Sequence, residues 1–190
     1  MSETELLENR STETLRARPV DMNIEVIVIP VSDVDRAKRF YGDLGWRLDI
    51  DYVKGEDYRV IQFTPPGSGC SIIFGKNVTL AEPGSMQGLH LIVSDIDAAC
   101  KDLRQRGIEI SAPFHDVGGI FHHAGTTGIA TGPNAQRKSY ASYASFSDPD
   151  GNGWVLQEVT ARLSANLPAG ETNFTDELAN AVRRAAAAKQ

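Results

Sequence analysis

The pentapeptide VSDVD at residues 31–35 returns, with one conservative change, as VSDID at residues 93–97. The two copies lie 62 residues apart. Further matches keep this spacing without a gap, namely Ala37 with Ala99 and Gly45 with Gly107. A constant offset of this kind indicates an internal duplication rather than chance.

Each copy predicts one amphipathic helix. Ser32 and Ser94 are the predicted N-caps, because each has an acidic residue three positions later. Apolar residues then recur at helical spacing in both copies. Gly45 and Gly107 suit the position just after a helix, where the left-handed backbone favours glycine.

Strand patterns surround both predicted helices. Runs rich in Ile and Val precede them, at residues 24–31 and 89–93. Short β-rich runs separated by turn residues follow them, at residues 47–53, 58–64, 70–74, 108–114, 139–147 and 154–160. The predicted unit is therefore βαβββ written twice, and the predicted fold class is α+β.

Two segments carry a resemblance to a known family. They are VSDVDRAKRFYGDLGW at residues 31–46 and FSDPDGNGWVLQEV at residues 146–159. With the tandem βαβββ pattern, they resemble the vicinal oxygen chelate superfamily, also called glyoxalase/bleomycin resistance/dioxygenase. The resemblance implies a curved, partly closed mixed sheet around a pocket, with helices outside. Asp148 and Asp150 are interpreted as turn residues.

The resemblance covers residues 22–160, which we predict to be one domain. Its modules are residues 22–75 and 87–160, and a long loop at 115–138 interrupts the second. Residues 1–21 form a predicted N-terminal arm, and residues 161–190 a predicted linker and C-terminal helix.

Many members of the superfamily hold a divalent metal through His and Glu side chains on inner strands. The resemblance places these ligand positions at Val26, Gly88 and Val155, and a fourth in the apolar run 71–74. A divalent ion needs three or four N, O or S donors to replace its water. We therefore predict no metal and no other cofactor.

A rebuilt metal site is the alternative, possible but not expected. His90 and Gln157 each lie two residues beyond a lost ligand and so face the same side of their strands. With a histidine from the long loop they would supply three donors.

The long loop holds three of the four histidines, His115, His122 and His123, and five glycines between residues 115 and 138. Loops of this length inside a domain are usually lids or flexible flaps, and the apolar Ile120 and Phe121 favour a lid. Imidazoles serve as general acids or bases near neutral pH. The predicted catalytic residues are His90, His122, His123 and Tyr140, although His90 as a hydrogen-bonded core histidine is an equal alternative.

The predicted pocket is apolar with a few polar groups. Its predicted substrate-binding residues are Val26, Val28, Gln62, His115, Phe121, Val155 and Gln157. Such a pocket suits a flat or hydrophobic organic molecule oriented by a few hydrogen bonds.

Composition limits the partners. The net charge of −6 and a pI near 5.2 argue against nucleic acid. The longest apolar run, residues 26–31, is too short to cross a membrane. Two cysteines in no CxxC pair favour a reducing cytoplasm. A homodimer is predicted as the assembly, with the modules paired either within one chain or across two.

Three functions compete. The first is a metal-independent lyase or isomerase of a small hydrophobic compound, using histidines for proton transfer. The second is a binding protein that sequesters such a compound, as in the bleomycin-resistance branch. The third is a metal-dependent glyoxalase or dioxygenase with shifted ligands. The histidine cluster favours the first over the second.

Overall fold

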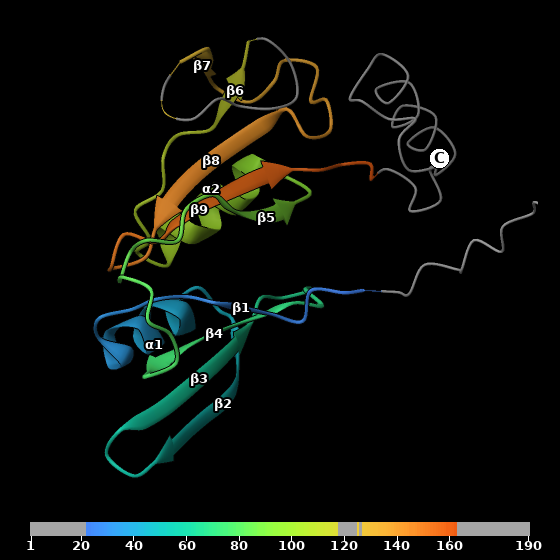
Figure 1. Ribbon diagram of the computed structural model, residues 1–190. Helices are drawn as coiled ribbons and strands as arrows, with labels where there is room; N and C mark the ends of the chain where they lie inside the picture. Colours follow the sequence, from blue (N-terminus) through green and yellow to red (C-terminus); the bar gives the residue numbers. More distant parts are fainter. Residues whose placement is uncertain (1–21, 118–124, 126, 163–190) are drawn as a thin grey trace, which may run out of the picture.

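Two mixed β-sheets and two helices make up the protein, as a computed structural model describes it for residues 22–117, 125 and 127–162 (Figure 1). The first sheet has the strand order β1-β4-β3-β2, and the second has β5-β9-β8-β6-β7. Neither sheet closes into a barrel. No helix in the described part of the chain is long and apolar enough to span a membrane.

The first module is one βαβββ unit. Its strands are β1 (Val26–Val28), β2 (Arg47–Lys54), β3 (Tyr58–Thr64) and β4 (Ser71–Lys76), and its helix is α1 (Val34–Asp43). β1 runs parallel to β4, whereas β3 pairs antiparallel with both β2 and β4. The β2–β3 hairpin projects away from the rest of the molecule (Figure 1).

The second module repeats this order with one additional strand. Its elements are β5 (Leu89–Val93), α2 (Ile96–Gln105), β6 (Phe114–Asp116), β7 (Ile129–Thr131), β8 (Ser142–Ser147) and β9 (Gly153–Glu158). β5 runs parallel to β9, as β1 does to β4. The predicted duplication and the α+β class are therefore confirmed.

The predicted N-caps were wrong by one residue. Asp33 accepts a hydrogen bond from the amide of Arg36 at 2.9 Å, and Asp95 accepts one from the amide of Ala98 at 3.0 Å. A carboxylate satisfies the free amides and also favours the positive end of the helix dipole. Gly45 and Gly107 do follow the helices with positive φ, at 77° and 82°.

The strands of the second module also differ from the prediction. The strand predicted at residues 108–114 does not form over 108–113, where Ile110 makes only an isolated bridge with Phe146. Pro113 has no N–H to donate to a ladder, so β6 begins after it. β6 then pairs with β7, a strand inside the predicted long loop. β8 begins later than expected because Tyr140 has a φ of 69°.

The helix-facing sides of both sheets share one hydrophobic core. Tyr41 on α1 lies at its centre, with ring centroids 5.3 Å from Trp46, 5.3 Å from Phe74 and 6.2 Å from Trp154. The rings of Trp46 and Trp154 meet edge to face at 5.3 Å, so each module supplies one of them. Cys100 is also buried in this core.

The turn between β8 and β9 joins the modules through polar contacts. Tyr41 donates a hydrogen bond to buried Asp148 at 2.9 Å, and Arg36 pairs with Asp150 at 2.7 Å. Asn152, with no exposed surface, donates to the Pro30 carbonyl at 2.9 Å. The turn residues of this signature therefore also fasten the second module to the first.

Candidate ligand-binding face

The open face of each sheet is the side turned away from its helix, and strand register shows which residues lie on it. In β5, Leu89 and Leu91 pack against the core, so His90 and Ile92 point to the open face. His90 pairs with Val155, and Ile92 with Gln157. The prediction that His90 and Gln157 face the same side is confirmed.

The open face of the second sheet has two adjacent rows of side chains. Paired residues share a face, so each row follows from the register. The upper row is Ile92, Gln157, Tyr143 and Phe114, and the lower row is His90, Val155 and Ser145. The face is therefore mostly aliphatic and aromatic, with an imidazole, an amide and hydroxyl groups.

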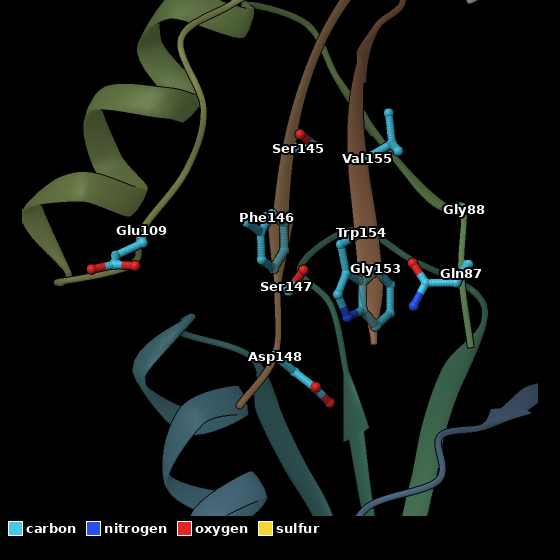
Figure 2. Close-up of a pocket in the computed structure, with 10 residues that line it drawn as sticks. All are labelled: Gln87, Gly88, Glu109, Ser145, Phe146, Ser147, Asp148, Gly153, Trp154 and Val155. Carbon is cyan, nitrogen blue, oxygen red and sulfur yellow. The ribbon is translucent and has the colours of Figure 1, made fainter. Parts of the chain in front are cut away.

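A cleft of about 570 Å³ opens beside the lower row (Figure 2). Gly88 and Val155, two of the ligand positions that the resemblance assigns to a metal, line it. Polar groups stand around it, with Gln87 on one side of β8 and β9 in the view and Glu109 on the other. Sequence reasoning did not find Glu109, because a single exposed acid after a helix carries no signal.

The positions inherited from a metal site do not fit a metal. Val26, Gly88 and Val155 offer no donor atoms. In β4, Ile73 shares the open face with Ser71, which is the only hydroxyl there. Within residues 22–117, 125 and 127–162, no group of three or more His, Cys, Asp or Glu side chains is placed to hold an ion.

A hydrogen-bond network holds the upper row. Tyr143 donates its hydroxyl proton to the Tyr140 carbonyl at 2.5 Å. Gln157 donates from Nε2 to the same carbonyl at 3.1 Å and to the Tyr143 hydroxyl at 3.4 Å. Burial raises the pKa of Tyr143 to about 12, so this hydroxyl stays protonated at physiological pH. Tyr143 therefore supports the wall as a neutral group.

The ring of Phe114 stacks on that of Tyr143 with centroids 5.7 Å apart. His115, the next residue along β6, pairs with Ser142 and so lies on the opposite side of the sheet from His90. Its Nδ1 is 2.8 Å from the Gly132 carbonyl oxygen. The structure thus brings Phe114, rather than His115, to the open face. The predicted residues Phe121, His122 and His123 lie outside the described part of the chain.

The open face of the first sheet carries the predicted residues Val28 and Gln62 in one row, joined by Ile73 and Ile50. Val26 lies at its edge and is 40% exposed. A polar cluster lies beside this row. In it Thr64 donates a hydrogen bond to Asp49, and its hydroxyl oxygen lies 2.7 Å from that of Ser71. Arg47 lowers the pKa of Asp49 through a hydrogen bond.

The fold and its open faces define a class of protein. The chain belongs to the Glyoxalase/Bleomycin resistance protein/Dioxygenase superfamily, whose family model matches residues 23–156.

Three solved structures give the more particular likeness. TnmS3, an antibiotic-binding protein from Streptomyces sp. CB03234, is 29% identical with a TM-score of 0.53, covering 75% of this chain and 99% of that one. A glyoxalase/bleomycin resistance protein from the same strain is 30% identical with a TM-score of 0.50, covering 72% and 100%. A superfamily member from Sphaerobacter thermophilus DSM 20745 is 27% identical with a TM-score of 0.52, covering 73% and 98%. A comparison with curated proteins gave no match.

Proposed function

We propose that this protein binds a small, largely hydrophobic organic molecule on the open face of its second sheet and sequesters it without the superfamily's usual metal. The observation that carries the proposal is the replacement of inherited ligand positions by apolar residues, with Val155 and Gly88 lining the cleft. Phe114, half-buried and stacked on the buried ring of Tyr143, extends this surface for a flat molecule. The likeness to an antibiotic-binding protein along nearly that protein's whole length supports binding as the function.

Catalysis by proton transfer is the second candidate, and His90 is the observation that favours it. Its side chain stands on the open face beside Val155, where a bound molecule would contact it. A lyase or isomerase would use this imidazole, together with Tyr140 and the histidines at 122 and 123, as acid and base. Under this candidate the protein would still bind its ligand before acting on it.

One experiment separates the two candidates. A panel of aromatic compounds is screened for binding by calorimetry, and each bound compound is incubated with the protein and followed by mass spectrometry. Sequestration predicts recovery of the compound unchanged, and a His90→Ala variant that binds within about threefold of the native protein, since one contact among many is lost. Conversion of a compound that stops in His90→Ala would establish the enzyme instead. Failure of every compound to bind would reject both.

Metal independence has its own test. Elemental analysis of the purified protein is expected to find no stoichiometric transition metal, and a chelator is expected to leave the melting temperature unchanged. Stoichiometric zinc, nickel, manganese or iron, with a loss of melting temperature on chelation, would favour a site rebuilt around His90 and Gln157.

We also propose that the first sheet pairs with a second copy of the chain. β2 is one of the two outer strands of its sheet, and its side chains Leu48, Ile50 and Tyr52 are 44%, 43% and 53% exposed. Exposed apolar side chains along an outer strand are otherwise prone to aggregate. Light scattering after size exclusion is expected to show a dimer that Ile50→Asp dissociates, whereas Leu80→Asp, at a fully exposed loop position, does not. A monomeric native protein at every concentration would contradict this pairing.

A location in the cytoplasm stays a prediction, supported by the two cysteines. Cys70 and Cys100 are both free, and Cys100 is buried.

A further inference from the structure

The amide of Gln157 is held in one orientation. Its Nε2 lies 3.1 Å from the Tyr140 carbonyl oxygen, which accepts hydrogen bonds and cannot donate them. The flipped amide would place Oε1 against that carbonyl, so the network admits only one arrangement. The Tyr143 hydroxyl donates to the same carbonyl at 2.5 Å and leaves its oxygen to receive Nε2.

This arrangement leaves an acceptor without a donor. Gln157 Oε1 accepts no hydrogen bond from any group in residues 22–117, 125 and 127–162, although the side chain is only 8% exposed. Among the described residues the wholly buried side-chain atoms without a partner are Arg36 Nε and Glu158 Oε2, so Gln157 Oε1 keeps some exposed surface. A bound molecule that covers Oε1 without donating to it would leave this acceptor buried and unpaired, which costs free energy. Because Oε1 and Nε2 diverge from one carbon, Oε1 points away from the Tyr140 carbonyl.

The surroundings of Gln157 belong to the proposed ligand face. Val155, two residues earlier on the same side of β9, lines the cleft. Ile92 on β5 is the register partner of Gln157 and is 40% exposed. A molecule that lies against Val155 and extends toward Ile92 therefore passes Gln157. On this stretch of wall the His90 imidazole, on the strand position paired with Val155, is the neighbouring polar group.

We propose that the ligand carries a hydroxyl or N–H donor on an otherwise apolar ring system, and that Gln157 Oε1 receives this donor and discriminates against molecules that lack it. The inference rests on the proposed binding function and narrows its ligand class. A site whose acceptor becomes covered by the ligand rejects an isostere without the donor more strongly than a hydrophobic wall rejects a missing methyl group.

Two pairs of probes that differ in the donor alone provide the test: 2-naphthol with 2-methoxynaphthalene, and indole with 1-methylindole. Affinities are measured by calorimetry at neutral pH. In the native protein, the donor of each pair is expected to bind about tenfold more tightly, the size of one hydrogen bond to an otherwise unpaired acceptor. Because both comparisons use the native protein, they do not depend on the folding of a variant.

The variant Gln157→Met assigns the preference to this residue. Its side chain has similar length and no amide, so the preference is expected to fall to about twofold or less, within the scatter of a lost neutral contact. Gln105→Met, at the exposed end of α2, is the matched control and is expected to keep the native preference. Melting curves establish that both variants fold.

Each outcome has a distinct meaning. Equal binding within both probe pairs overturns this inference while the proposed binding function stands. A preference that survives in folded Gln157→Met overturns the role of Gln157. Absence of binding by all four probes and by the wider aromatic panel rejects the proposed function, and the inference with it.

Discussion

The side chain of Asn152 links three segments, and its removal is the most informative change to stability. Nδ2 donates to the Pro30 carbonyl at 2.9 Å and to Asp148 Oδ2 at 2.7 Å, and Oδ1 accepts from the Met86 amide at 3.1 Å. The first module, the connection between modules and the second module therefore meet at one fully buried amide.

Asn152→Ala removes all three hydrogen bonds and leaves buried partners unsatisfied. At about 1 kcal/mol for each bond, the free energy of unfolding should fall by roughly 3 kcal/mol. For a domain of this size, that corresponds to a melting temperature lower by about 10 °C. Urea unfolding followed by tryptophan fluorescence suits the measurement, because Trp46 and Trp154 touch across the same interface.

Two further variants sharpen this prediction. Asn152→Asp keeps an acceptor for Met86 but sets a second carboxylate beside Asp148, so it should destabilise at least as much as alanine. Asn23→Ala, at an exposed position, is the matched control and should be neutral. A loss below about 1 kcal/mol in Asn152→Ala would refute the view that this amide holds the modules together.

Three other perturbations follow from the structure. The raised pKa of Tyr143 means that, between pH 10 and 12, the folded state keeps a proton that the unfolded state loses. The free energy of unfolding should therefore fall as pH rises from 10 toward 12. The urea midpoint of Tyr143→Phe should fall less over this range than that of the native protein. Arg137→Ala leaves the fully buried Glu158 carboxylate without its cation, which lies 2.5 Å away. The free energy of unfolding in urea should fall by about 2 kcal/mol, less than for a wholly buried pair because Arg137 is 39% exposed. Arg137→Lys should lose less, and equal loss in both variants would contradict this reasoning. Gly75→Ala would set a Cβ 1.8 Å from a backbone carbonyl oxygen of β3 and should abolish soluble expression, whereas Gly42→Ala, in a helix with open space around it, should raise stability by about 0.5–1 kcal/mol; normal folding of Gly75→Ala would refute the packing of β4 on β3.

The duplicated modules were predictable because their signals are local and repeated. Alternation within single strands also placed His90 and Gln157 on one face, since side-chain direction in a strand has a period of two. The capping residues were missed because Ser and Asp both cap helices, and adjacent candidates differ by only one position.

Contacts between distant segments left no trace in the sequence. The acids in the turn between β8 and β9 looked like turn residues, yet they pair with Tyr41 and Arg36 more than a hundred residues away. The β6–β7 hairpin was hidden in a glycine-rich stretch, and its register decided that His115 turns away from His90. Glu109 reaches the cleft only through the path of the chain after α2.

The polar contacts that the turn between β8 and β9 makes with α1 have a consequence for the duplication itself. The corresponding turn of the first module, PPG at residues 65–67, has no acidic side chain to return the contact. The two modules are therefore no longer equivalent, because the first receives polar contacts from the turn of the second and its own turn does not return them. If the chain were severed between β4 and β5, the amino-terminal fragment would keep Tyr41 without its carboxylate acceptor, together with an uncovered cluster of rings. The amino-terminal and carboxy-terminal fragments, mixed in solution, should therefore bind each other and restore this interface.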